Sequence, residues 1–407
     1  MSLNRLLFAS IHGYLDPSSG AATATRDLLE LLAARGVDCR VLTTGVLDDH
    51  HEADLGPILD RLGVEVGRPR AALSRGGDVS VYDLWLGGVR VTALSTASSR
   101  VERSPDARES AVFLDLVAQA LDRFRPQVLL TYGGHPAGLA LTAAARRAGA
   151  AVVFHLHNFA YADRRPFTDA TAVLVPTDFC RRFYAERLGL DCTTIPYPFH
   201  PARVVAAGRT PHYLTFVNPI PAKGLAVFAR IAAELDRRRP DIPLLVVEGR
   251  GTAAQLDDAG LDLSGLRNLS RKASTPDPRD FYRVSRVVLM PSLWLENGAM
   301  VAREAMANGI PVLSSDRGAL PETVAGAGLV LPVPARCTPA SREVPTAAEV
   351  EPWPAAVERI WDDPGHESDL RGRALQAARR WNPDRLAPEY ERFFSGVARE
   401  ASTRGAR

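Results

Sequence analysis

The chain has 407 residues, which is more than a single hydrophobic core normally accommodates, so we expect two domains. Its hydrophobic content of 46% and charged content of 24% are typical of a globular protein. A net charge of +2 creates no broad electrostatic field, which argues against nucleic acid or a membrane surface as the partner.

The cysteines and the apolar runs indicate the compartment. The four cysteines show no C-x-x-C spacing, so we predict neither a zinc site nor a disulfide framework. The first 20 residues hold too short an apolar run for a signal peptide, and no later run reaches the about 18 apolar residues of a membrane span. We therefore expect a cytoplasmic protein without integral membrane association. Arginine and alanine are abundant while Lys223 and Lys272 are the only lysines, which suggests a GC-rich bacterial source.

Short apolar runs alternate with helical patterns along the chain, as in βαβ units with a mostly parallel sheet. Strands are predicted at 5–10, 37–44, 127–132, 151–157, 172–177, 213–217, 243–249, 286–292 and 310–315, and helices at 21–35, 224–238 and 385–400. The segment 194–213 is rich in proline and alanine and is predicted to be the interdomain hinge. We predict two doubly wound domains, 1–205 and 206–384, with the helix at about 385–400 able to pack on either.

Doubly wound sheets bind ligands beyond the carboxyl ends of their strands, so the loop after strand 286–292 is a candidate site. Glu296 lies in this loop, and Glu304 lies on a helix that we expect to run from about Ala299 to a stop at Gly309. The first backbone N–H groups of that helix form an anion site suited to phosphate: those of Gly298, Ala299, Met300 and Val301.

From the spacing alone, the two glutamates have a second interpretation. Glu296 and Glu304 would face solvent or form ion pairs with Arg303 and Arg317.

The string PSLWLENGAMVAREAMANGIPVLSSDRGALPE, residues 291–322, resembles the E-x7-E region of the retaining GT-B glycosyltransferases grouped as family 4. Segments 215–232 and 151–159 also resemble that family, and the likeness is strongest from about 213 to 331. The resemblance implies a GT-B fold, with two Rossmann-like domains facing a central cleft. The first domain would bind the acceptor and the second a nucleotide-sugar donor.

The resemblance also implies roles in the second domain. Glu304 would hold the ribose hydroxyls, Glu296 with Asn297 and the N–H groups after it would hold the donor sugar, and Lys223 would contact the diphosphate. Asn218 stands where the family usually has a phosphate-binding arginine, so the missing charge would come from Arg250, Arg271 or Lys272. Gly298 and Ala299 replace the family's usual phenylalanine and glycine.

In the first domain the resemblance points to Gly20 and His157. Gly20 is retained from a double glycine and would bring a helix N-terminus to the donor phosphate, although an ordinary turn with Ser18 or Ser19 as N-cap explains the same residues. His157 would approach the donor sugar or the acceptor hydroxyl, with His155 and His135 as alternatives.

These assignments predict a retaining transfer of sugar from a nucleoside-diphosphate sugar to an acceptor hydroxyl, with His157, Lys223 and Glu296 as catalytic residues. The chain contains no D-x-D pair, so we expect neither a metal nor another cofactor. Segment 46–96 resembles nothing assignable and carries no basic amphipathic helix, which favours a small-molecule acceptor such as a natural product. The sequence contains no signal that indicates the oligomeric state.

Three other functions are alternatives for a chain with two such domains. One is a catalytically degenerate paralogue that binds nucleotide sugar or partners another transferase. The others are a GT-B phosphorylase or sugar epimerase, and a dehydrogenase, for which no G-x-G-x-x-G follows the first strand.

Overall fold

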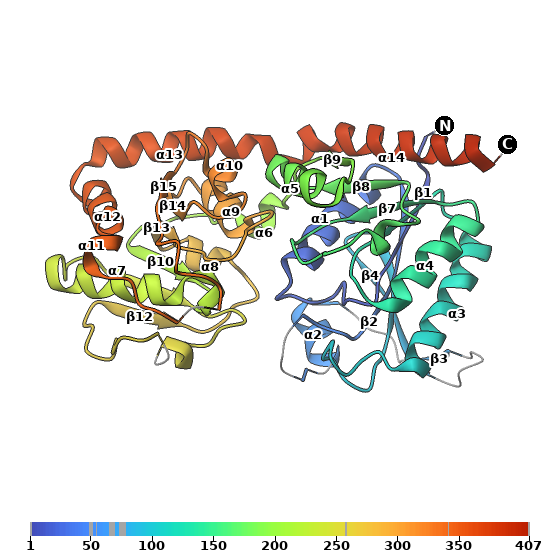
Figure 1. The fold of residues 1–407 in the computed structure, drawn as a ribbon, viewed down its shortest axis with the longest axis horizontal. Coiled ribbons are helices and arrows are strands. Elements are labelled where there is room, and N and C mark those ends of the chain that lie inside the picture. Colours follow the sequence, from blue (N-terminus) through green and yellow to red (C-terminus); the bar gives the residue numbers. More distant parts are fainter. Residues whose placement is uncertain are drawn as a thin grey trace. The chain divides into compact units, whose positions relative to one another are not determined.

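The computed structural model describes residues 2–48, 52–53, 55–64, 70–72, 79–256, 259–340 and 342–405. The chain forms two compact units (Figure 1). The first comprises Met1–Pro198 and Pro383–Arg407, and the second comprises Phe199–Asn382. The closing helix α14 (Pro383–Gly405) is therefore part of the first unit.

The first unit contains a nine-stranded sheet in the order β3-β4-β5-β2-β1-β6-β7-β8-β9. The strands are β1 (Arg5–Ala9), β2 (Asp38–Thr44), β3 (Arg70–Ala72), β4 (Val79–Leu86), β5 (Val89–Leu94), β6 (Val128–Thr131), β7 (Ala151–His155), β8 (Ala172–Val175) and β9 (Cys192–Thr194). Its helices are α1 (Gly20–Ala34), α2 (Leu55–Arg61), α3 (Ala107–Phe124), α4 (Pro136–Arg147), α5 (Asp178–Leu188) and α14. All pairings are parallel except those that β4 makes with β3 and β5.

The first sheet is covered on both faces, as a parallel sheet requires. Side chains alternate along β1, so Leu6 and Phe8 join one core cluster while Leu7 and Ala9 join another. Helix α14 supplies Tyr390 and other apolar residues to the cluster of Leu6 and Phe8. The predicted strands of this half are present, but the β3–β5 part of segment 46–96 was not predicted, and residues 49–51, 54, 65–69 and 73–78 of that segment lie outside the described residues.

The second unit contains a six-stranded parallel sheet in the order β12-β11-β10-β13-β14-β15. The strands are β10 (Tyr213–Val217), β11 (Leu244–Val247), β12 (Leu269–Lys272), β13 (Ser285–Met290), β14 (Val312–Ser315) and β15 (Leu329–Leu331). The helices are α6 (Pro201–Val204), α7 (Leu225–Arg238), α8 (Arg279–Tyr282), α9 (Met300–Ala307), α10 (Leu320–Val324), α11 (Ala347–Val350), α12 (Pro352–Asp362) and α13 (Pro364–Ala378). The predicted hinge segment thus contains a short helix, α6.

Strand order reverses once in each sheet, between β1 and β6 in the first and between β10 and β13 in the second. At such a switch point the loops after the two strands diverge, which opens a crevice for ligands beyond their carboxyl ends.

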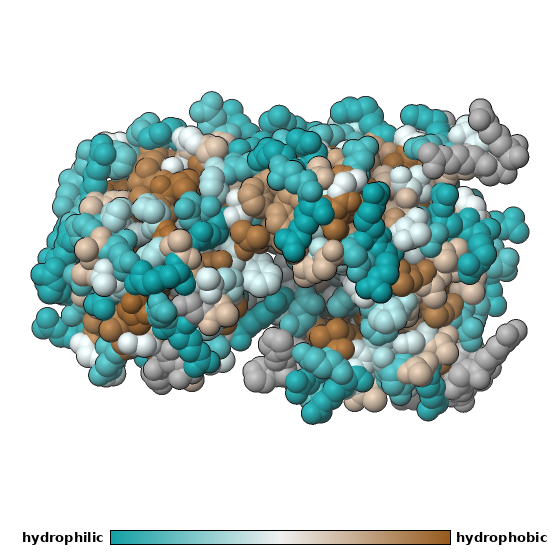
Figure 2. Space-filling model, in the orientation of Figure 1, coloured by the Kyte–Doolittle hydropathy of each residue, from teal (hydrophilic) through white to brown (hydrophobic). Residues whose placement is uncertain are grey.

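The surface view in Figure 2 shows small apolar groups among polar ones on both units. Among the described residues, no helix is both long and apolar enough to cross a membrane.

Candidate functional site

In the second unit, Lys223 and Glu296 meet at the switch point between β10 and β13. Lys223 ends a 3-10 turn (Pro221–Lys223) after β10, and Glu296 lies in the loop between β13 and α9. The Lys223 Nζ lies 2.5 Å from Glu296 Oε1, and the Ser292 hydroxyl donates to the same oxygen at 2.8 Å. Glu296 is only 7% exposed. The two predicted residues therefore form a largely buried ion pair, and Glu296 does not face solvent.

Close backbone approach brings these loops together. Gly224 follows Lys223 with φ +85°, and a Cβ at this position would lie 1.9 Å from the carbonyl oxygen of Pro291. Ala222 accepts hydrogen bonds through its carbonyl from the N–H groups of both residues that follow Ser292, each at 2.9 Å. Only glycine combines this φ with this contact, which explains the lysine-glycine pair.

A second glycine holds the other side of the Glu296 loop. Gly318 has φ +60°, and a Cβ there would lie 2.4 Å from the backbone nitrogen of Glu296. The next residue, Ala319, donates its N–H to the Glu296 carbonyl at 2.7 Å. The loop after β14 thus braces the buried glutamate.

Glu304 lies in the second turn of α9, which spans Met300–Ala307 and is followed by Gly309 at φ +65°. The predicted stop at Gly309 is confirmed. Tyr282, at the end of α8, donates its hydroxyl to Glu304 Oε2 at 2.9 Å. Burial and the nearby carboxylate raise the pKa of Tyr282 well above its usual value, so its hydroxyl stays a donor. Tyr282 orients Glu304, and sequence reasoning missed it because 22 residues separate them.

Asn218 connects two loops at the carboxyl ends of β10 and β11. Its φ is +64°, and its Oδ1 accepts from the N–H of Gly251 at 2.8 Å, which ties the loop after β10 to the loop after β11. Arg250 belongs to that second loop, whereas Arg271 and Lys272 end β12 at the edge of the sheet. Among the candidates for the missing charge, Arg250 is therefore the one in the loop that Asn218 braces.

The remaining predicted donor-binding residues belong to the same β13–α9 connection. They are Asn297, Gly298 and Ala299 in the loop, and Met300 and Val301 in the first turn of α9. Ala299 adopts the left-handed conformation with φ +41°, which is unfavourable for any residue with a Cβ.

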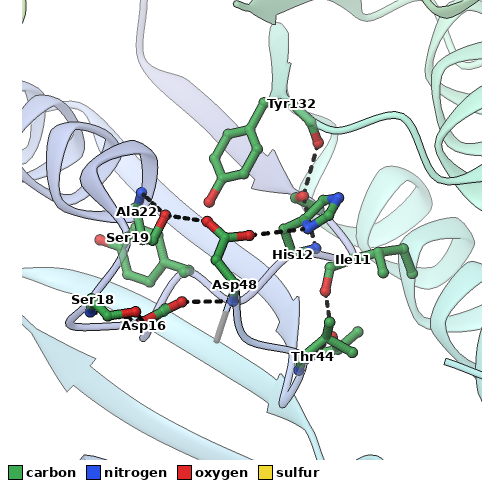
Figure 3. Close-up of polar contacts among 12 residues, drawn as sticks. Ile11, His12, Asp16, Ser18, Ser19, Ala22, Thr44, Asp48 and Tyr132 are labelled. Carbon is green, nitrogen blue, oxygen red and sulfur yellow. Dashed lines mark hydrogen bonds and ion pairs between the residues drawn. The ribbon is translucent and has the colours of Figure 1, made fainter. Parts of the chain in front are cut away.

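In the first unit, Gly20 is the first residue of α1 and Ser19 is its N-cap. Ser19 accepts from the N–H of Ala22 at 3.4 Å and donates its hydroxyl to Asp48 Oδ2 at 2.6 Å. Figure 3 shows Asp48 reaching toward Ser19 with one oxygen and toward His12 with the other. The capping interpretation of the serine is confirmed, and the start of α1 lies beside a carboxylate.

His12, Asp48 and Tyr132 form a polar cluster that the sequence analysis did not predict. The Asp48 carboxylate lies 3.7 Å from His12 Nδ1, and the rings of His12 and Tyr132 stack with centroids 6.2 Å apart. His12 follows β1 and Tyr132 follows β6, so both lie at the switch point of this sheet. The available signal was the position of His12 shortly after the first strand, in the loop that leads to Gly20.

The three candidate histidines differ in their surroundings. His135 is the N-cap of α4, where its Nδ1 accepts from the N–H of Ala137 at 3.1 Å. His155 ends β7 and is fully buried, and burial lowers its pKa to about 3. His157 lies past the end of β7, and its Nδ1 is 2.6 Å from the Tyr197 hydroxyl. Burial and the neighbouring His155 lower the pKa of His157 well below its usual value, so both imidazoles are neutral at pH 7.

In the part of the chain that the structure describes, no group of three or more His, Cys, Asp and Glu side chains is placed to hold a metal ion.

Solved structures show which class of fold this is. HepE from Anabaena, described in complex with UDP, has a TM-score of 0.66 at 14% identity, and the match covers 97% of this chain and 100% of that one. Sucrose-phosphate synthase from Thermosynechococcus elongatus has the same TM-score at 15% identity, over 97% and 99% of the two chains. The chain has the GT-B fold.

Sequence comparisons show the family. Residues 18–203 match the model described as Glycosyltransferase Family 4, and residues 203–335 match Glycosyl transferases group 1. The two matches are contiguous and together span most of the chain, which therefore belongs to the family 4-like GT-B glycosyltransferases.

Curated relatives match over part of their length. The lipopolysaccharide 1,2-N-acetylglucosaminetransferase of Salmonella typhimurium is 29% identical over 44% of this chain and 52% of its own. The phosphatidyl-myo-inositol mannosyltransferase of Mycolicibacterium smegmatis is 32% identical over 39% of this chain and 43% of its own. The matched stretches thus span about half the length of these relatives.

Proposed function

We propose that this protein transfers a sugar from a nucleoside-diphosphate sugar to a hydroxyl group of a small-molecule acceptor, with retention of the anomeric configuration and without a metal. The proposal rests mainly on the part-buried Lys223–Glu296 pair at the switch point of the second sheet, with Glu304 on the helix that follows. A cation, a carboxylate that can accept sugar hydroxyls and a helix N-terminus are the groups that bind and activate such a donor.

Each group has one task in the transfer. Lys223 and the first N–H groups of α9 stabilise the negative charge that develops on the leaving diphosphate. The two side-chain contacts of Glu296 described above both use Oε1, and its other oxygen accepts a hydroxyl of the donor sugar. Glu304, oriented by Tyr282, accepts the ribose hydroxyls.

In this proposal the first unit binds the acceptor. The carboxylates of Asp48 and Asp16 lie beside the start of α1, where Asp48 also donates its backbone N–H to Asp16 Oδ2 at 2.8 Å. Negative charge at this helix start disfavours a second anion. A neutral or amine-bearing acceptor suits these surroundings better than a phosphorylated one, and the diphosphate is then bound by the second unit.

The donor can be identified by ligand stabilisation. A thermal-shift panel of UDP, GDP, ADP and TDP with their sugars should give one series that raises Tm, because a ligand stabilises the folded state according to its occupancy. The UDP complex of HepE, which shares the fold, makes the UDP series the first to test.

Product analysis then tests the reaction. With the matched donor, transfer should continue in excess EDTA, and NMR of the first-formed product should show the anomeric coupling of the donor. His157→Ala should reduce transfer while nucleoside diphosphate affinity stays within about twofold, because the residues proposed to bind the nucleotide belong to the second unit. An inverted product contradicts retention, and loss of activity in EDTA contradicts metal independence. Absence of any transfer or donor hydrolysis would favour the degenerate nucleotide-sugar-binding alternative.

A further inference from the structure

Tyr197 contacts His157 although 40 residues separate them along the chain. The Tyr197 hydroxyl lies 2.6 Å from His157 Nδ1, and the two ring centroids are 5.3 Å apart. His155 packs against both, with centroids 4.1 Å from His157 and 5.3 Å from Tyr197. Among the described residues, the buried Nε2 of His157 and both ring nitrogens of His155 have no hydrogen-bond partner. The tyrosine thus makes the one side-chain hydrogen bond found on the ring nitrogens of these two histidines in the described chain.

The chemistry of the two groups favours one position of the proton. A neutral imidazole carries one N–H, and its other nitrogen is a good acceptor. A phenol is a better donor than acceptor, because its oxygen lone pair is delocalised into the ring. The 2.6 Å contact itself fits either direction, and this donor preference favours a Tyr197 O–H that donates to Nδ1, with the proton of His157 on Nε2.

The segment that carries Tyr197 is itself held in place. This segment, residues 195–198, follows β9 and ends the N-terminal part of the first unit. Tyr390 of α14 donates its hydroxyl to the carbonyl of Pro196 at 2.9 Å, one residue before Tyr197. The position of the Tyr197 phenol relative to His157 follows from its own ring contacts with His155 and His157.

We propose that Tyr197 is a positioning residue that keeps His157 in the Nε2–H tautomer, in which Nε2 donates a hydrogen bond to a substrate hydroxyl. The tautomer is argued from contacts within the first unit alone, whereas its use in catalysis rests on the proposed function. Without the phenol hydroxyl, the imidazole keeps its packing against His155, but its proton is shared between the two nitrogens.

The test is Tyr197→Phe, which removes only the hydroxyl. In protein with ¹⁵N-labelled histidine, the ring nitrogen shifts of His157, assigned with His157→Gln, should show the Nε2–H form in the wild type. Tyr197→Phe should show a mixture of tautomers. Its kcat should fall about tenfold, the effect of one lost hydrogen bond. The donor KM and the diphosphate Kd should stay within about twofold, a split that general destabilisation of the fold would not produce.

Tyr390→Phe is the matched control, since it removes a tyrosine hydroxyl of α14 that contacts the segment before Tyr197 but not His157, while the buried ring of residue 390 keeps its packing. It should keep the wild-type tautomer and kcat. An Nδ1–H form in the wild type, an unchanged tautomer and kcat in Tyr197→Phe, or an equal loss in Tyr390→Phe would each overturn the positioning role. Because the tautomer is measured without substrate, a tautomer change in Tyr197→Phe in a protein that transfers no sugar would support the positioning role and count against the proposed function.

Discussion

Replacing Lys223 by methionine separates its chemical role from its structural one. The change removes the cation 2.5 Å from Glu296 Oε1 and leaves a carboxylate whose side chain is 9% exposed with the Ser292 hydroxyl as its remaining partner. Since Ser292 still donates and the Lys223 side chain is 29% exposed in the wild type, we expect a loss of about 1–3 kcal/mol in the free energy of unfolding. Tm should fall by about 2–4 °C for each kcal/mol in a unit of this size.

The chemical effect should be larger. Loss of one donor that stabilises leaving-group charge lowers kcat/KM by on the order of 10²–10³. The double variant Lys223→Met/Glu296→Gln tests whether the two effects are independent, because a neutral glutamine needs no cation. Denaturant unfolding should show that it regains most of the lost stability, while steady-state assays should show that transfer stays low. Wild-type kcat/KM in Lys223→Met, or recovery of activity together with stability in the double variant, would refute the assignment to the diphosphate.

Three further changes test other features. Glu304→Ala should weaken nucleoside diphosphate binding by about 1–3 kcal/mol in calorimetric titrations while Glu296→Ala leaves it nearly unchanged, and equal losses would mean that the ribose and sugar positions are wrongly assigned. Ala299→Gly should raise the free energy of unfolding by about 0.5–1 kcal/mol because φ is +41°, whereas Ala302→Gly inside α9 should lower it by about 1 kcal/mol; the same sign for both would exclude left-handed strain. Tyr14→Phe should stabilise the first unit by about 1 kcal/mol in denaturant unfolding, because the fully buried Tyr14 hydroxyl has no partner among the described residues, and a loss of stability would show that the hydroxyl is satisfied.

The sequence by itself determined the features that depend on local pattern. The alternation of apolar runs and helical periodicity predicted the buried parallel strands, and Gly309 predicted the end of α9. The spacing of Glu296 and Glu304, with the string around them, indicated the family that the comparisons confirm. Such signals are readable because a strand, a helix end or a motif requires particular residues within a few positions of one another. The β3–β5 strands were missed because the prediction relied on continuous apolar runs, whereas β4 and β5 alternate apolar and polar residues, as half-buried antiparallel strands do.

Only the tertiary structure decided how the site is assembled. Strand order places the switch points between β10 and β13 and between β1 and β6, and this order brings Lys223 to Glu296 across 73 residues. From the sequence, Glu296 could either bind a ligand or face solvent in a surface ion pair. The sequence also contained no indication that Tyr197 contacts His157. These contacts join loops that are distant in the chain, so they depend on sheet topology and on backbone conformations such as that of Gly224. Neither sheet topology nor such a backbone conformation produces a repeating pattern of residues in the sequence.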